Sequence, residues 1–394
     1  MRMQFGTFIA PFHPAGQNPT LALQRDLDLI TRLDQLGYDE VWIGEHHSGG
    51  WEIIASPELF LAVAGERTKN IRLGTGVVSL PYHHPFMVAD RIVLLDHLTR
   101  GRAMLGVGPG ALPGDAKFLG IEATRQREMM DESLGIIMRL LTEEEPVTYT
   151  SDWFELHEAQ LQLKPYQRPT MPVAVASTIS PSGMVCAGKH GAGVLSLATY
   201  SEEGITAITT QWANCVEAAA KAGRPAPDRA SWRLVVPFHL ADSKEEAIND
   251  VVDGAFRWYN EYLINIMGAP GRVPVPNGRM LIDGMNAYGG GVVGTPDDAI
   301  ACIERLQEIS GGFGCLLGLG HEWTTREKTL RSYELFAQHV MPHFQDTVSW
   351  VERSRDWTLA NKEALAQRTV SAITKAIADH SGTPQEQPVA KSEG

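Results

Sequence analysis

Short apolar runs and longer amphipathic segments alternate along most of this 394-residue chain. The runs have the length of β-strands, and the segments between them repeat apolar residues every three or four positions, as helices with one buried face do. The predicted strands cover residues 5–10, 40–44, 71–80, 102–107, 173–176, 193–197, 232–240 and 315–319. The predicted helices cover residues 20–36, 57–68, 85–98, 125–141, 202–222, 244–267, 296–309 and 325–340. About eight such repeats predict an α/β fold with parallel pairing, a (β/α)8 TIM barrel with insertions; an open doubly wound sheet is the alternative.

Three regions depart from this repeat. Residues 146–163 alternate as a β-hairpin does, and residues 268–294 are rich in Gly, Pro and Asn, which is typical of a long functional loop such as a lid. The composition of the last residues is typical of disorder. We therefore expect a barrel domain over residues 1–345, with insertions at about 146–163 and 268–294, and a C-terminal helical extension with a disordered tail over 346–394.

Composition and charge exclude several classes of partner. The formal net charge of −13 disfavours nucleic acid and anionic membranes. The four cysteines form no CxxC pair, which suits reduced cysteines in a cytoplasmic protein. No apolar run has the length of a signal-peptide core or a membrane span. We therefore expect a cytoplasmic protein that binds neither nucleic acid nor a membrane.

The second predicted strand ends in an acid and two histidines. Polar residues where a barrel strand meets its loop occupy the place where such folds put their catalytic groups. Successive strand side chains point to opposite faces, so Glu45 and His47 point one way and His46 the other. A second pair, His83 and His84, invites a metal interpretation. Because each pair is adjacent, only one member of each faces inward, and we expect no metal.

Glycines interrupt two neighbouring strands. Gly74 and Gly76 lie inside a predicted strand, where a glycine often marks the close approach of a ligand. Gly108 belongs to a glycine-rich loop after the next strand, but Ala111 stands where a dinucleotide fingerprint needs its third glycine. We interpret this segment as a tight loop against a ligand and not as an NAD site.

Small hydroxyl residues gather between the fifth predicted strand and the helical pattern that follows it. They are Ser177, Thr178, Ser180 and Ser182. Hydroxyls beside the free N–H groups of a helix N-terminus form a phosphate site, whereas ordinary helix capping is the alternative. The density of hydroxyls favours phosphate.

Taken in order, these motifs resemble those of the bacterial-luciferase-like flavin-dependent monooxygenases. The matching segments are FGTF at 5–8, GYDEVW at 37–42, EHH at 45–47, LGTGV at 73–77, LP at 80–81, HP at 84–85, LLD at 94–96, GR at 101–102, GVG at 106–108 and GTP at 294–296. They extend over residues 1–345. Residues 10–20 and 43–58 look most similar to the terpene-oxidising branch of that family.

The resemblance implies a role for individual residues. The first histidine of the family's Glu-His-His motif assists the oxygen chemistry, and His46 matches it as the catalytic residue. The flavin-binding positions that match are Gly76, Val77, Gly108, Ser177, Thr178, Ser180 and Ser182. A family arginine that helps to hold the phosphate corresponds to Pro109, so binding would depend on hydroxyls and helix N–H groups. This departure leaves the choice between FMN and FAD open.

The resemblance also implies the reaction. Reduced FMN or FAD would react with O2 to give a C4a-hydroperoxide, which oxygenates a small hydrophobic substrate, here a monoterpene such as limonene by epoxidation. A separate NAD(P)H-dependent flavin reductase would supply the reduced flavin through transient contact, with NADH as the electron source. Candidate substrate-pocket residues are Phe8, Phe12, Trp51 and Tyr82, although ordinary packing explains each of them equally well.

Four other functions stay open. They are Baeyer–Villiger oxidation of a cyclic ketone, a deazaflavin-dependent dehydrogenase reaction, flavin binding without catalysis, and a metal-dependent hydrolase. We further expect a homodimer or a higher homo-oligomer.

Overall fold

The predicted strands form one closed barrel in the computed structural model, which describes residues 2–381 except 11, 198, 200 and 269–271. Its strands are β1 (Gln4–Ile9), β2 (Glu40–Ile43), β3 (Arg72–Thr75) continued by β4 (Val78–Ser79), β5 (Ala103–Gly108), β8 (Val173–Ser177), β9 (Gly193–Ser196), β10 (Trp232–Val236) and β13 (Cys315–Leu319). The sheet runs in the order β3, β2, β1, β13, β10, β9, β8, β5, and the parallel pairing of β3 with β5 closes it. The predicted (β/α)8 barrel is confirmed.

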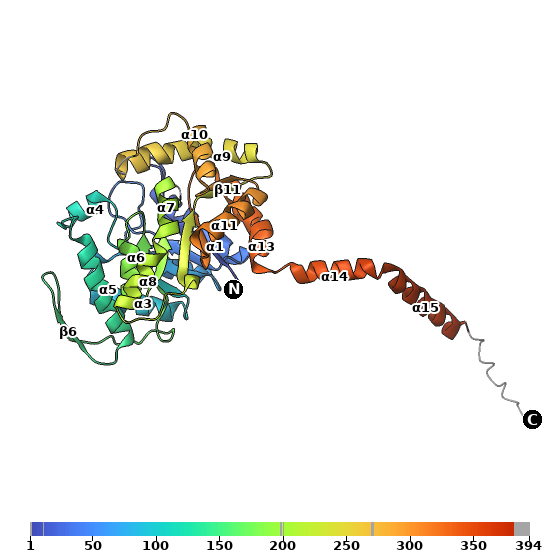
Figure 1. The fold of residues 1–394 in the computed structure, drawn as a ribbon, viewed down its shortest axis with the longest axis horizontal. Coiled ribbons are helices and arrows are strands. Elements are labelled where there is room, and N and C mark those ends of the chain that lie inside the picture. The colour runs from blue at the N-terminus through green and yellow to red at the C-terminus, as the bar shows by residue number, and fades with distance from the viewer. Residues whose placement is uncertain (1, 11, 198, 200, 269–271, 382–394) are drawn as a thin grey trace, which may run out of the picture. The chain divides into compact units, whose positions relative to one another are not determined.

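Helices surround the barrel (Figure 1). The helices of the first half are α1 (Pro19–Leu36), α2 (Pro57–Arg67), α3 (Pro85–Leu98), α4 (Pro113–Phe118), α5 (Gln126–Thr142) and α6 (Ser182–His190). Those of the second half are α7 (Glu202–Thr210), α8 (Trp212–Lys221), α9 (Lys244–Arg257), α10 (Gly278–Tyr288), α11 (Pro296–Ser310), α12 (Arg326–Leu335) and α13 (Met341–Gln345). Local signals set their ends: Asn18 caps α1 by accepting the N–H of Thr20, and Gly37 ends it with a left-handed φ of 81°.

Residues 1–345 also contain short and irregular helical segments. They are the 3-10 turns η1 (Leu80–Tyr82) and η2 (Arg229–Ser231) and the π-helical segments η3 (Trp258–Ile266) and η4 (Phe336–Val340). The segments η3 and η4 directly continue α9 and α12. Segments of this kind often occur at functional sites, and η3 supplies a residue of the site described below.

Apolar side chains along the strands form two separate cores. One includes Phe8 and Trp42 and lies inside the barrel. The other includes Val41 and Ile43 and lies between the barrel and its helices. The alternation along β2 follows from strand geometry and, when continued past the strand end, places His46 on the side of the inner core.

A buried ion pair lies at the opposite end of β2. Arg233 of β10 bonds both oxygens of Glu40, with Nε–Oε2 and Nη2–Oε1 distances of 2.6 and 2.7 Å. The indole N–H of Trp42 donates to the same carboxylate at 2.9 Å, and the guanidinium lies 5.0 Å from the Trp42 ring centroid. Glu40 is completely buried, so these partners replace the water that a charged group would otherwise require.

Several predicted elements are divided in the structure, among them the strand 71–80 into β3 and β4 and the helix 202–222 into α7 and α8. The expected strand 232–240 breaks at Pro237, because proline cannot donate a ladder hydrogen bond. Its second part, β11 (Phe238–Leu240), leaves the barrel sheet and pairs in parallel with β12 (Val292–Gly294).

The expectation of a long loop at 268–294 is wrong for most of its length, because α10 and β12 occupy much of it. Asn277 caps α10 by accepting the N–H of Met280, and the helix buries Leu281, Ile282 and Met285. Its apolar stripe was obscured by the surrounding glycines and prolines. The first insertion contains the antiparallel pair β6 (Val147–Thr150) and β7 (Glu155–Ala159).

The chain divides into two compact units, Met1–Gln345 and Asp346–Gly394. The second contains α14 (Ser349–Ala360) and α15 (Lys362–His380), neither of which buries a residue. The tail expected to be disordered lies, from residue 382 onward, outside the described residues. In the part of the chain that the structure describes, no helix combines the length and apolar character needed to cross a membrane.

Candidate active site

The imidazole of His46 lies between two carboxylates just beyond the end of β2. Its Nδ1 is 2.9 Å from Oδ2 of Asp115, and its Nε2 is 3.5 Å from Oε2 of Glu52. Only 12% of its side chain is exposed. The ring is therefore held at both nitrogens, which fixes its orientation at the site where the sequence predicted a catalytic histidine.

Asp115 is positioned to orient this histidine. It belongs to α4, its side chain is buried, and its second oxygen accepts the hydroxyl of Ser48 and the backbone N–H of His47 at 3.1 Å. Burial opposes its charge, but the hydrogen bonds from His46 and Ser48 lower the pKa of the Asp115 carboxyl. A charged Asp115 accepts the Nδ1–H of His46, which leaves Nε2 facing Glu52.

Glu52 occupies a different environment. It lies in the loop after β2, its side chain is 3% exposed, and it accepts the phenolic hydroxyl of Tyr262 from η3. Burial raises the pKa of Glu52, although His46 and the Tyr262 hydroxyl favour its charged form. Burial also disfavours the His46 imidazolium, but Glu52 and Asp115 outweigh it and raise the pKa of His46. His46 and Glu52 therefore each hold a proton more readily than the same side chain does in water.

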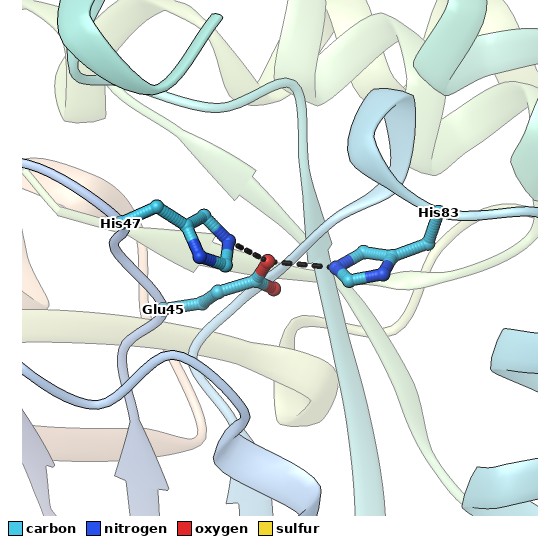
Figure 2. Close-up of side chains that lie close together, drawn as sticks. All are labelled: Glu45, His47 and His83. Atoms are coloured by element: carbon cyan, nitrogen blue, oxygen red, sulfur yellow. Dashed lines mark hydrogen bonds and ion pairs between the residues drawn. The ribbon is translucent and has the colours of Figure 1, made fainter. Parts of the chain in front are cut away.

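Glu45 forms a second cluster with His47 and His83, shown in Figure 2. Its Oε1 lies 2.9 Å from Nε2 of His47 and 2.7 Å from Nε2 of His83, and its Oε2 accepts the N–H of Ser79 at 3.0 Å. Burial works against its charge, but the two histidines lower the pKa of Glu45. The structure thus places Glu45 and His47 together and His46 apart from them, as strand alternation predicted.

The spacing of this cluster would also suit a metal ion, since the three donor atoms lie within 4.8 Å of one another. One member of each histidine pair takes part, as the sequence suggested. The Glu45 carboxylate bonds both imidazoles directly, so the three side chains form a hydrogen-bonded link between the loops after β2 and β4.

Gly74 of β3 and Gly76, which lies between β3 and β4, leave space that large side chains fill. A Cβ at Gly74 would lie 2.5 Å from the Trp42 ring, and one at Gly76 would lie 2.8 Å from the Phe8 ring. The Gly76–Val77 bond is cis, and a Cβ at Gly108 would meet Val77 at 2.6 Å. The structure therefore places Gly76 next to Phe8 of β1, and Val77 next to Gly108 of β5.

The hydroxyl cluster between β8 and α6 has the features of a phosphate site. The Oγ of Ser177 is buried and has no hydrogen-bond partner among the described residues. Ser180 and Ser182 lie with their hydroxyls 3.1 Å apart at the start of α6, which has no side-chain cap, whereas Thr178 is exposed. Open helix N–H groups beside an unpaired hydroxyl fit a phosphate group. Pro109 directly follows β5, the strand that pairs with β8, and its carbonyl accepts the Gln126 amide.

Aromatic side chains pack next to the His46–Glu52 pair. Tyr262 lies edge-on to Phe12 and tilted against Trp51, with centroid distances of 4.8 and 5.7 Å. Trp258 packs edge-on against Phe12 at 5.8 Å. An open cavity of about 580 Å³ is lined by Phe12, Trp51 and Trp258 among others. Phe12 and Trp51 are thus placed where an apolar substrate could bind.

Tyr82 does not join this aromatic group. Its hydroxyl accepts the amide of Gln126 at 3.1 Å, and its ring lies 6.0 Å from that of His47. Tyr82 thus lies beside His47 of the Glu45 cluster. Its role in a substrate pocket stays a prediction.

A larger open cavity of about 850 Å³ lies between the end of β1, α1 and α12. Its wall contains His13, whose Nδ1 is 2.9 Å from Glu322 and whose Nε2 is 3.1 Å from Asp26. Burial disfavours the charged ring, but both carboxylates outweigh it and raise the pKa of His13 to about 9. Arg25 also bonds Glu322, so each charged group of this cluster has a partner of opposite charge.

The sequence profile of the family described as luciferase-like monooxygenase matches residues 3–311. The chain belongs to the luciferase-like monooxygenase family. It is 48% identical over 372 residues to 4-hydroxyprotoasukamycin monooxygenase of Streptomyces nodosus subsp. asukaensis, which covers 94% of this chain and 99% of the relative. It is 46% identical over 375 residues to limonene 1,2-monooxygenase of Rhodococcus erythropolis, with 95% of each chain covered.

A solved structure supports the same assignment. The oxygenating constituent of 3,6-diketocamphane monooxygenase of Pseudomonas putida, a type II Baeyer–Villiger monooxygenase in complex with FMN, superposes with a TM-score of 0.72 at 26% identity. The match covers 87% of this chain and 99% of that chain. This luciferase-like chain is therefore an oxidoreductase, and the predicted resemblance is confirmed.

The sequence did not identify Glu52, Asp115 or Tyr262 as site residues of this luciferase-like monooxygenase. Glu52 directly follows Trp51, and Asp115 follows the glycine-rich loop after β5, so position next to predicted loops was the available signal. No local signal marks Tyr262, which lies 210 positions from its partner Glu52.

Proposed function

We propose that this chain is a monooxygenase that uses reduced FMN and O2 to add one oxygen atom to a carbon–carbon double bond of a monoterpene such as limonene. The observation that carries the proposal is the placement of His46, a buried imidazole held between two carboxylates. One of them, Glu52, bonds Tyr262, which packs against Phe12 and Trp51 of the open cavity. The 46% identity to limonene 1,2-monooxygenase supports the substrate class. When bound, the reduced flavin supplies two electrons and activates O2.

The residues at the ends of the middle strands would hold the flavin. Gly76 and Val77, between β3 and β4, lie beside Gly108 at the end of β5, and these three residues would contact the ring system. Ser177, Ser180 and Ser182 would bind the phosphate through hydroxyls and the N-terminus of α6. The FMN complex of a relative favours FMN over FAD.

The chain's own contribution is proton control and the exclusion of water. Because Asp115 fixes Nδ1, His46 can hold or release a proton only at Nε2. An imidazole with a pKa above its ordinary value remains protonated further into the neutral range, which suits proton donation. Phe12, Trp51 and Trp258 would offer apolar surface to a hydrocarbon in the nearby open cavity, whose wall also contains Asp253, Arg257 and Glu322.

We also propose that a separate reductase supplies the reduced flavin, as the family resemblance implies. The partner would be an NAD(P)H-dependent flavin reductase that contacts the enzyme transiently. Assembly into a homodimer or a higher homo-oligomer remains part of this proposal.

Product analysis with photochemically reduced flavin tests the function without a reductase. The purified chain, O2 and FMN or FAD would be mixed with limonene and other monoterpenes, and the products separated by gas chromatography with mass detection. We expect limonene epoxide or its hydrolysis product, with FMN the better flavin. Substitution His46→Ala should lower product by roughly a hundredfold or more without loss of flavin binding.

The control is His157→Ala, which removes an exposed histidine of the β6–β7 hairpin. It should match the wild type. Equal losses in the two variants, or near-normal coupling of O2 use to product in His46→Ala, would refute the role of His46.

Baeyer–Villiger oxidation is the second candidate, because the solved relative with FMN is of that type. Cyclic ketones such as camphor therefore belong in the same panel. Lactones from ketones in the absence of any epoxide would replace alkene oxidation as the proposed reaction.

A further inference from the structure

The two carboxylates on either side of His46 differ in what else they bind. Asp115 accepts three groups, from His46, His47 and Ser48, and its pKa is lowered. Glu52 is buried, lies opposite Nε2 of His46 and accepts the Tyr262 hydroxyl. Asp115 holds the His46 ring at Nδ1, and Glu52 lies at the other nitrogen, where a proton can be gained or lost.

The position of Glu52 determines where a proton can reside. Its Oε2 lies 3.5 Å from Nε2 of His46, so the two groups form an ion pair when the imidazole carries its second proton. Tyr262 donates to the other oxygen, which turns Oε2 towards the imidazole. Phe12 packs against the Tyr262 ring, and this holds the phenol in place.

We propose that Glu52 is a positioning residue that keeps a proton on the His46–Glu52 pair, that Tyr262 holds Glu52 in this role, and that the arrangement selects electron-rich alkenes over ketones as substrates. The inference rests on the proposed function and deepens it. The charged or titratable groups that face the pair are Asp115 of α4, Glu45 and His47 beyond the end of β2, His13 beyond β1, and Tyr262 of η3.

The stoichiometry explains the link to the substrate. Alkene, O2 and two-electron-reduced flavin give epoxide, oxidised flavin and water. One oxygen atom of O2 forms the two new carbon–oxygen bonds, the O–O bond breaks, and the other oxygen leaves as water, which requires a proton. Oxygen insertion into a ketone needs a nucleophilic oxygen first, and a group that retains its proton disfavours this. A proton-retaining pair therefore favours the alkene.

Histidine NMR on the flavin-free protein tests the proton directly. In the 394-residue chain with labelled histidine, the His46 signal would be assigned by its absence from His46→Ala. Glu52→Gln keeps the shape and removes the charge, so the pKa of His46 should fall. Tyr262→Phe should also lower the pKa of His46, by a smaller amount, because the Glu52 carboxylate loses the hydrogen bond that holds it in place. Tyr259→Phe, a matched change in η3, should leave it unchanged.

The pH dependence of turnover separates proton control from structural damage. In Glu52→Gln, the alkaline limb of epoxide formation should move to lower pH, and the yield per flavin oxidised at pH 8 should fall at least roughly tenfold, with hydrogen peroxide in its place. Acidification should restore part of the yield. The ratio of ketone product to epoxide should rise. Glu52→Asp retains the charge and should recover part of the wild-type profile.

Two results would overturn the inference. One is an unchanged His46 pKa in both Glu52→Gln and Tyr262→Phe. The other is a loss of epoxide that is equal at every pH, which indicates a structural role only. If wild-type enzyme oxygenated no alkene, the proposed function would fail, whereas the NMR titration would still decide whether Glu52 holds the proton.

Discussion

The unpaired hydroxyl of Ser177 gives a prediction in which stability and flavin affinity change in opposite directions. The residue ends β8, is 2% exposed, and its Oγ has no hydrogen-bond partner among the described residues. A buried polar group without a partner costs about 1–3 kcal/mol. Ser177→Ala removes this cost and leaves almost no cavity, so the flavin-free variant should be at least as stable as the wild type and up to about 1 kcal/mol more stable.

Binding of FMN should respond in the opposite way. If the hydroxyl donates to the phosphate, its loss removes a hydrogen bond to a charged group, worth about 1.5–3 kcal/mol. Since about 1.4 kcal/mol corresponds to a factor of ten, the dissociation constant should rise roughly 10- to 100-fold. Riboflavin lacks the phosphate and should bind wild type and variant alike.

Urea unfolding of the flavin-free protein and anaerobic titration with reduced FMN and riboflavin measure the two effects. Ser133→Ala is the matched control, because Ser133 Oγ on α5 is also buried without a partner among the described residues. It should raise stability in the same way and leave FMN affinity unchanged. A destabilised Ser177→Ala, or an equal loss for FMN and riboflavin, would refute the assignment of the phosphate to this segment.

Two further predictions concern stability. Arg233→Met leaves Glu40 charged and buried without its cation, and should lower the free energy of unfolding by about 3–5 kcal/mol in urea titrations. Arg139→Met on the surface of α5 should cost far less, and similar losses in the two variants would contradict the importance of burial. His13 has a folded-state pKa raised to about 9, so its stabilising charge is fully present below its unfolded pKa of about 6.5 and is lost as the pH rises through 9. Unfolding titrations from pH 6.5 to 9.5 should show this decline in the wild type and a weaker one in His13→Gln.

The sequence predicted the barrel because its signals are local. The spacing of apolar residues in each segment indicates which of its faces is buried, and capping residues such as Asn18 and Gly37 mark helix ends. Alternation along β2 was enough to separate His46 from Glu45 and His47. The same reasoning failed at residues 268–294, where glycines and prolines concealed the buried face of α10.

The polar partners within the barrel were decided by tertiary structure alone. Glu40 meets Arg233 across 193 positions, and Glu52 meets Tyr262 across 210. Such pairs leave no periodic signal, because each depends on barrel closure bringing distant strands and loops together. The sequence by itself determined that a histidine at the end of β2 faces inward. Only the closed barrel decided which carboxylates surround it, because a proton site in a buried space is defined by groups that meet in three dimensions.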